Sequence, residues 1–211
     1  MVRKLDYLYH KGIYQEELRK FLPSTPVLLD SLRTFKRLQA RQKEKIFGDL
    51  TETQLEQSFN EQVFCRAFGY DSQFMKAAGQ FHVLPKVYMG SQYNDFSLGY
   101  SNGSTRNQFV SKTTVELKGP NADLEDGAIA QAFKYARTSS AVEWVLACNF
   151  REIFIFDKSD KSKGLYFDLT QVTDSRSAKR ILFPIAAGAF FNLDGTIGRL
   201  EKIRRRVKWS R

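Results

Sequence analysis

The sequence contains few residues of the kind that bind transition metals. It has two cysteines and two histidines among 211 residues. Cys65 and Cys148 stand outside any CxxC or Cys/His spacing, and His10 and His82 are far apart along the chain. This distribution excludes a zinc site built on those spacings and offers no histidine-based catalytic pattern. We expect both cysteines to be buried thiols of a protein from a reducing compartment.

Long apolar runs are also missing. No stretch reaches the roughly 18 apolar residues that would span a bilayer, and the opening MVRKLDYLYHKG lacks the apolar region of a signal peptide. We therefore expect a cytoplasmic protein without membrane contact. Glycine-rich phosphate loops, nucleophile elbows and methyl-donor motifs are absent, so neither ATP hydrolysis nor methylation is expected within this chain.

Negative charge is scarce relative to positive charge. The 23 acidic residues face 33 lysines and arginines, which gives a net charge of +10. A sequence pI of about 9.6 follows. Such an excess of positive charge attracts polyanions. It indicates the kind of binding partner and does not indicate the fold. Nucleic acid is the leading candidate partner, and a basic protein that merely stays soluble is the alternative.

The chain divides into three parts: a basic helical extension over residues 1–50, a core over 51–198, and a basic tail over 199–211. In the extension, Leu28 and Phe35 share one helical face with Leu32. Basic side chains fill much of the remaining surface of this predicted helix, namely Arg33, Lys36, Arg37, Arg41, Lys43 and Lys45. The segment FLPST should separate two helices.

The core begins with a helix and continues with strands. Thr51 followed by Gln54 is a capping-box pattern, and Gly69 is a candidate C-terminal cap. Strand-like runs follow in FHVLP, DFSLGY and TTVEL, then a helix over Glu125–Arg137, then strands in VEWVLACNF and EIFIFD. The last two strands are expected to pair through the turn at 149–151. This order predicts an α/β fold with a mixed sheet flanked by helices.

The strand run TTVEL carries the chain's one D/E-x-K triplet, Glu116-Leu117-Lys118. Side chains alternate across a strand, so Glu116 and Lys118 project from the same face. Gly119 and Pro120 follow at once and end the pairing. An ordinary ion pair on a solvated strand is the alternative interpretation of this triplet.

Asp95 begins an earlier strand run, and the turn-rich stretch between the two strands would bring it beside Glu116. Two carboxylates make a hard, oxygen-rich site, which suits Mg²⁺, with Mn²⁺ as a substitute. Such an ion activates water and neutralises charge on a phosphate undergoing attack. Lys118 would position or deprotonate the water and add a fixed positive charge.

The runs YNDFSLGY, TVELKGP and AIAQAFKYA together resemble the PD-(D/E)xK nuclease domain, especially the N-terminal cleavage domains of type IIG restriction-modification proteins and type I restriction subunits. The resemblance covers roughly residues 51–157. It implies a restriction-endonuclease-like fold and Mg²⁺-dependent cleavage of DNA. One departure is Asn94, which stands where the family's name places proline.

The same resemblance implies further site residues. The family's downstream helix carries Q-x-x-x-Y, which Gln131 and Tyr135 match, and a four-residue spacing puts both on one helical face. Gln131 is then a catalytic-site residue and Tyr135 a DNA contact; a partly buried polar helix edge is the alternative. The family's first helix carries a glutamate, for which Glu56 is the first choice and Glu52 and Glu61 are competitors.

The tail RLEKIRRRVKWSR is a basic cluster with one tryptophan. It is interpreted as a DNA-contacting helix carrying Arg204, Arg205 and Arg206, as a solvated end, or as a linker to a further domain.

Three functions compete. The first is a Mg²⁺-dependent endonuclease that cuts double-stranded DNA in a restriction-modification or related defence system, as a homodimer or attached to a methyltransferase or specificity module. The second is a non-catalytic nucleic-acid-binding module with a degenerate nuclease fold. The third is an assembly domain whose basic helices dock on a larger partner.

Overall fold

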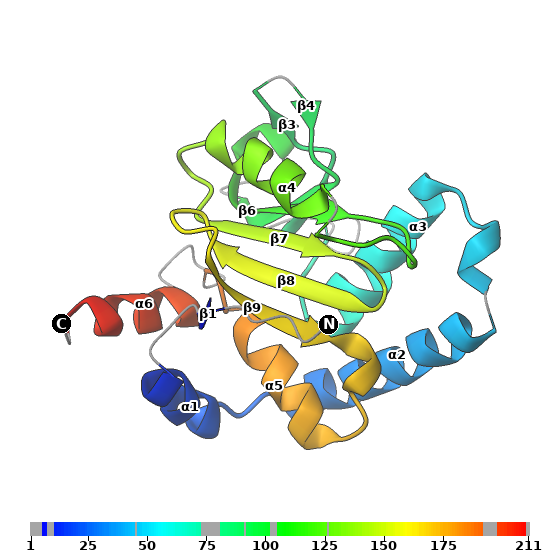
Figure 1. Ribbon diagram of the computed structural model, residues 1–211, viewed down its shortest axis with the longest axis horizontal. Helices are drawn as coiled ribbons and strands as arrows, with labels where there is room; N and C mark the ends of the chain where they lie inside the picture. The colour runs from blue at the N-terminus through cyan, green and yellow to red at the C-terminus, as the bar shows by residue number, and fades with distance from the viewer. Residues whose placement is uncertain are drawn as a thin grey trace.

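The computed structural model describes residues 6–7, 11–44, 46–72, 81–90, 92–101, 105–125, 127–191 and 198–209. His10 and Lys45 lie outside these residues, as do residues 102–104 within the turn-rich stretch expected between two of the strands. Helices cover both faces of a central sheet, and a small hairpin projects from one side of the molecule (Figure 1).

Within the described residues, the central sheet has seven strands in the order β1-β9-β8-β7-β6-β5-β2. Their bounds are β1 Asp6–Tyr7, β2 Val83–Pro85, β5 Phe96–Ser101, β6 Phe109–Leu117, β7 Trp144–Cys148, β8 Glu152–Asp157 and β9 Lys163–Asp168. The β6–β7 and β1–β9 pairs are parallel, and the other pairs are antiparallel. The predicted mixed sheet flanked by helices is thereby confirmed. The strands β3 Tyr88–Met89 and β4 Gln92–Tyr93 form the separate hairpin.

The helices are α1 Lys11–Lys20, α2 Thr25–Lys43, α3 Glu52–Phe59, the π-helical η2 Asn60–Ala67, α4 Ala128–Arg137, α5 Ser175–Ile185 and α6 Arg199–Trp209. Short 3-10 turns occupy Ile46–Asp49, Arg106–Gln108 and Leu169–Gln171. The sequence predicted two helices separated by residues 21–25, which are α1 and α2, and Thr25 proves to begin α2. It also predicted the helices α3 and α4 and the β7–β8 pair. It missed strand β9, helix α5 and the hairpin β3–β4.

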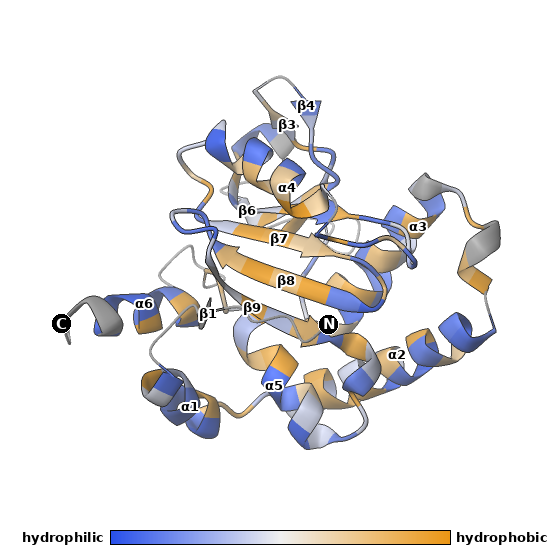
Figure 2. Ribbon diagram, viewed as in Figure 1, coloured by the Kyte–Doolittle hydropathy of each residue, from blue (hydrophilic) through white to orange (hydrophobic). Residues whose placement is uncertain are grey.

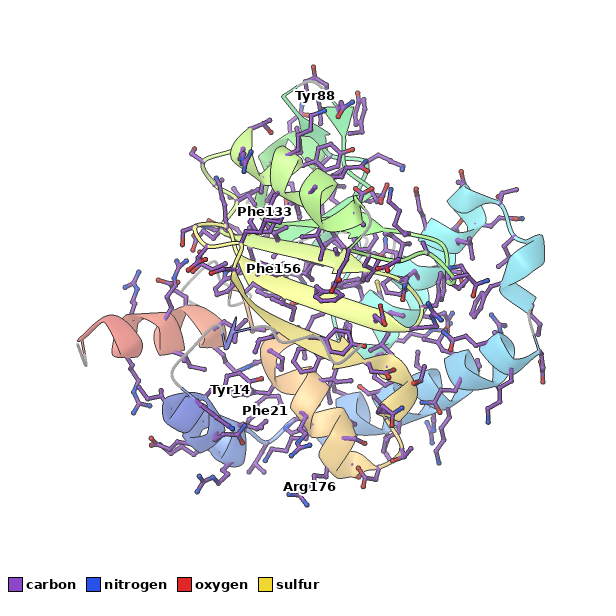
Figure 3. All side chains as sticks on the ribbon, in the orientation of Figure 1. Tyr14, Phe21, Tyr88, Phe133, Phe156 and Arg176 are labelled. Carbon is purple, nitrogen blue, oxygen red and sulfur yellow. The ribbon has the colours of Figure 1, made fainter. Side chains whose placement is uncertain are left out.

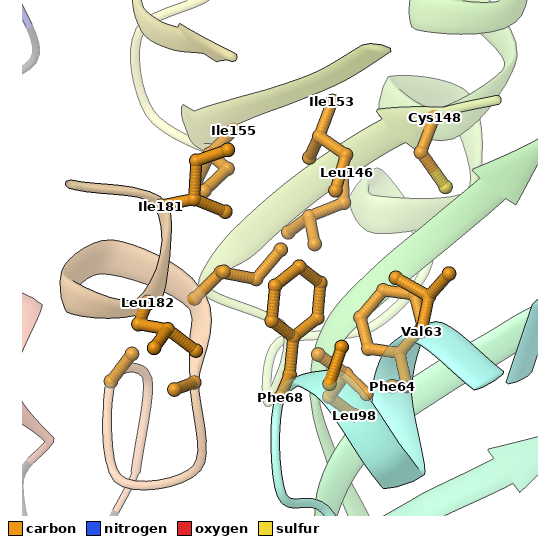
Figure 4. Packing of buried hydrophobic residues seen from close by; sticks show 14 of the residues in the cluster. Val63, Phe64, Phe68, Leu98, Leu146, Cys148, Ile153, Ile155, Ile181 and Leu182 are labelled. Carbon is orange, nitrogen blue, oxygen red and sulfur yellow. The ribbon is translucent and has the colours of Figure 1, made fainter. Parts of the chain in front are cut away.

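Two hydrophobic clusters hold the layers together, and the alternation of side chains along each strand assigns residues to one or the other. On β7, Leu146 and Cys148 belong to the larger cluster beneath η2, α2 and α5, whereas Val145 and Ala147 belong to the smaller cluster beneath α4. Figure 4 shows the larger cluster, in which Phe64 of η2 and Phe68 just after it pack against the sheet. Apolar colour accordingly concentrates on the inner strands β7 and β8 (Figure 2).

The helix α3 begins as its sequence predicts and then changes form. The Thr51 side chain accepts from the Gln54 amide, and the Gln54 side chain accepts from Thr51, which completes the capping box. The helix continues into the π-helical η2 and gives way to Gly69, whose φ of +74° favours glycine. One apolar stripe is partly or fully buried along the joined helix: Leu55, Phe59, Val63 and Ala67. This joined helix forms one wall of the candidate site.

The helices α1, α2 and α6 share the hydrophobic core of the sheet. Phe35 of α2 is fully buried and its ring centroid lies 5.9 Å from that of Phe68. Tyr14 of α1 packs edge-on against Phe183 of α5 (Figure 3). Leu200 of α6 belongs to the same cluster. The tail is therefore a packed helix over the residues that the structure describes.

Of the helices described, none is long and apolar enough to cross a membrane.

The packing of α2 on η2 predicts a large effect of one buried ring. We expect Phe35→Ala to lower the free energy of unfolding by about 3–5 kcal/mol, because it leaves a cavity against Phe68. Urea unfolding followed by circular dichroism and by tryptophan fluorescence measures this. Leu22→Ala is the matched control, since Leu22 is 85% exposed and should change stability by less than about 0.5 kcal/mol. Separate transitions by the two probes would show that α2 is not part of one cooperative core.

Candidate active site

The pairing of β5 with β6 brings two carboxylates together. In this antiparallel pair Phe96 lies opposite Val115, so one further step places Asp95 opposite Glu116 on the same face. The ladder does not continue through that step. Instead, the Leu117 amide donates to Asp95 Oδ2 at 2.7 Å. This bond holds the Asp95 side chain beside the end of β6, as the sequence predicted.

A chain of hydrogen bonds runs from Glu116 to helix α4. Lys118 Nζ donates to Glu116 Oε1 at 2.6 Å and to Gln131 Oε1 at 3.3 Å, and Gln131 Nε2 donates to Tyr135 Oη at 2.8 Å. The four-residue spacing on α4 therefore aligns Gln131 and Tyr135 as expected. Tyr135 is buried, so it contacts Gln131 from beneath and has little surface to offer a duplex.

Glu116 is the most deeply buried of the charged side chains in this group. Its side chain is only 2% exposed, and its Oε2 is buried without a hydrogen-bond partner. Burial raises the pKa of Glu116 to about 7, and the nearby Asp95 charge acts in the same direction, while the Lys118 ammonium opposes both. A buried carboxylate oxygen with no donor is the arrangement that a cation would relieve.

Sequence analysis missed Lys86, which joins the site to helix α3. Its Nζ lies 2.8 Å from Glu56 Oε1 and 3.3 Å from Asp95 Oδ1. Among the described residues it is the one non-glycine residue with positive φ, at 50°, and its backbone amide donates to the Asp95 carbonyl at 2.9 Å. Lys86 belongs to no sequence motif, and only the fold places it between two carboxylates.

The structure also separates the three acids considered for the first helix. Glu56 lies across Lys86 from Asp95, whereas Glu61 is exposed one turn further on and accepts from Gln57 at 3.2 Å. The side chain of Glu52 lies outside the described residues. The geometry therefore favours Glu56, the first choice from the sequence.

A buried asparagine anchors the strand that carries Asp95. Asn94 is fully buried; its Oδ1 accepts from the Val87 amide at 3.1 Å. Its Nδ2 lies within hydrogen-bonding distance of the Phe96 carbonyl, Ser97 Oγ and Thr114 Oγ1. The residue at the family's proline position thus ties the base of the β3–β4 hairpin to both β5 and β6.

Asp95 and Glu56 open onto a cleft of about 590 Å³ between the α3–η2 helix and strands β2 and β5, and Glu116 lies buried behind Asp95. Its walls are formed by Thr53, Glu56, Gln57, Asn60, Glu61, Cys65, Arg66, Ser72, Pro85, Lys86, Asp95 and Phe96. Access from solvent to Asp95 and Glu56 therefore runs through this cleft.

The donor set fits one hard divalent ion better than two. Among the described residues, no three His, Cys, Asp or Glu side chains gather closely enough to form a metal site by themselves. Asp95 and Glu116 are adjacent, and the unpartnered Glu116 Oε2 supplies an available oxygen. The Lys86 ammonium already neutralises Glu56 and one oxygen of Asp95. Two carboxylates plus water match the usual coordination of Mg²⁺.

The tail arginines lie elsewhere. Helix α6 is at the opposite end of the molecule from α3 (Figure 1). Arg204 pairs with Glu143, Asp157 and Glu201. Arg205 also pairs with Glu201, and Arg206 pairs with Glu16 and Glu17 of α1. These ion pairs weigh against the tail as the main phosphate-contacting segment.

Comparison with protein-family models finds no match, and comparison with curated proteins finds none. Among solved structures, the chain is similar to a cryo-electron-microscopy structure of a DrdV–DNA complex, with a TM-score of 0.46 and 16% sequence identity. That alignment covers 73% of this chain and 14% of the other.

The raised pKa of Glu116 predicts how stability depends on pH in the absence of divalent ions. The folded pKa of about 7 exceeds the ordinary 4.5, so between these values the folded state binds more protons than the unfolded chain. The free energy of unfolding should therefore fall as pH rises through this interval, by roughly 3 kcal/mol at most. Glu116→Gln should remove this fall. Urea unfolding in EDTA at pH 5 and pH 8 tests it, and an unchanged pH dependence in the variant would refute the assignment to Glu116.

Proposed function

We propose that this protein is a Mg²⁺-dependent endonuclease that hydrolyses DNA phosphodiester bonds. The observation that carries the proposal is the placement of Asp95 and Glu116 opposite one another at the end of β6, with the Lys118 ammonium 2.6 Å from Glu116. An ordinary surface ion pair leaves its carboxylate exposed and satisfied. Glu116 is instead buried beside a second carboxylate, with one oxygen unpartnered.

Each residue has a defined task in this reaction. Asp95 and Glu116 hold the ion, which supplies water activation and neutralises charge on the phosphate. Lys118, fixed by Glu116 and Gln131, contributes a preorganised positive charge where negative charge develops on the phosphate oxygens. Gln131 limits the rotation of the ammonium, and Tyr135 in turn fixes Gln131. Lys86 keeps Glu56 and Asp95 at the mouth of the cleft despite their like charges.

DNA is the substrate that the charge of the chain favours. A net charge of +10 supplies attraction for a polyanion. The direct test is incubation of supercoiled plasmid with the protein, with and without Mg²⁺, followed by separation of nicked and linear forms. Formation of these products only with Mg²⁺ supports the proposal, and intact plasmid at high protein concentration contradicts it.

Lys118→Ala should lower the rate of plasmid cleavage by on the order of a hundredfold or more, because it removes a preorganised charge from the transition state. Lys134→Ala is the matched control: Lys134 lies on the same helix as Gln131, and its exposed ammonium bonds Gln92 at 3.1 Å. The control should cleave at the parental rate. Full activity in folded Lys118→Ala would remove Lys118 from the site.

Asp95→Ala and Glu116→Ala should each abolish measurable binding of divalent ions, since each deletes a hard oxygen ligand from a set of two. Calorimetric titration with Mn²⁺ should give one ion per parental chain and none for either variant. Glu61→Ala is the control, because Glu61 lines the same cleft but accepts from Gln57 and is not linked to Asp95 by Lys86 in the way that Glu56 is. Undiminished binding in both test variants would reject these ligands.

A further inference from the structure

A second, smaller pocket lies beside the candidate site on the outer side of helices α2 and η2. It encloses about 360 Å³ and is lined by Asp30, Arg33, Thr34, Arg37 and Arg66. Three guanidinium groups thus converge from two helices onto one depression, with a single carboxylate among them. The excess of positive charge here selects an anionic ligand.

The arginines of this pocket are paired with carboxylates weakly or not at all within the described residues, so they can bind an anion. Arg33 makes one long contact of 3.6 Å with Asp30, and both side chains are mostly exposed, so that pair is weak. No carboxylate in the described part of the chain pairs with Arg37 or Arg66. By contrast, Arg204 is held by three carboxylates. A phosphate therefore reaches Arg37 and Arg66 without breaking an existing ion pair.

Arg66 connects this pocket with the active-site cleft. It lines both hollows, because η2 forms the wall between them. Glu56 and Arg66 lie ten residues apart on the joined α3–η2 helix, an axial distance of at most roughly 15 Å at the α-helical 1.5 Å per residue, because the π-helical part rises less. At about 3.4 Å of axial rise per nucleotide, this corresponds to about four nucleotide steps along one strand. A DNA strand bound at Asp95 would therefore reach the arginines within about four nucleotides of the cleaved bond.

We propose that Arg33, Arg37 and Arg66 form a subsite for the phosphodiester backbone of the DNA strand that leaves the active-site cleft. The inference rests on the proposed nuclease function and names the surface that holds its substrate. Guanidinium groups match phosphate oxygens with paired hydrogen bonds, and such contacts fix the register of a duplex without reading its sequence.

The test compares two double variants that remove equal charge. Arg37→Ala/Arg66→Ala removes the two subsite arginines that no described carboxylate pairs with. Arg205→Ala/Arg206→Ala removes two arginines that are already paired with carboxylates. Fluorescence anisotropy with a labelled duplex in EDTA, across a salt series, gives the affinity and its salt slope. The first variant should bind at least tenfold more weakly at low salt, with a slope flattened by roughly 1.8, about 0.9 for each lost phosphate contact. The second should match the parent.

Further arms decide between ligands and between hypotheses. Arg37→Lys/Arg66→Lys should restore the salt slope, because it keeps both charges. Equal losses in the two alanine variants, or a loss confined to Arg205→Ala/Arg206→Ala, would overturn the subsite. A third result would also overturn it: inorganic phosphate stabilises the parent but not Arg37→Ala/Arg66→Ala, while both proteins bind DNA equally well. The pocket would then be a site for free phosphate. Because these measurements need no Mg²⁺, a parent that binds through this subsite but does not cleave plasmid refutes the nuclease function alone.

Discussion

The hydrogen bond from the Leu117 amide to Asp95 Oδ2 is the contact on which the arrangement of the site depends. At 2.7 Å it takes the place of the next ladder bond between β5 and β6. It thereby fixes a carboxylate beside the buried Glu116, where repulsion would otherwise drive the two apart. Lys118 and Lys86 offset that repulsion from opposite sides. The electrostatic cost of this pair is what distinguishes the group from a surface ion pair.

Local periodicity accounts for the parts of the site that the sequence could predict. Alternation along a strand put Glu116 and Lys118 on one face, and helical spacing aligned Gln131 with Tyr135. The structure brings all four into one hydrogen-bonded chain. The layers of the fold were predictable for the same reason, because apolar stripes and alternating runs are properties of neighbouring residues.

Long-range contacts account for what the sequence could not predict. Lys86 meets Glu56 across thirty residues of chain, and no local pattern records that approach. One interpretation of the tail from the sequence was a solvated basic end. In the structure Leu200 is buried and Arg204 is ion-paired with β8 through Asp157. Which arginines stay available for a phosphate is therefore decided by where the acidic residues lie in space.

Asn94 has a consequence for how the protein tolerates change. Proline at this position would restrict the backbone, but it has no side chain that could bond to the strands around it. Asn94 instead closes the base of the β3–β4 hairpin through buried hydrogen bonds to β5 and β6. These bonds hold the backbone beside Asp95 without help from the outer part of the hairpin, whose Gln92 contacts Lys134 of helix α4 instead. We therefore expect an insertion or a grafted peptide at the end of this hairpin to leave the carboxylates in their places.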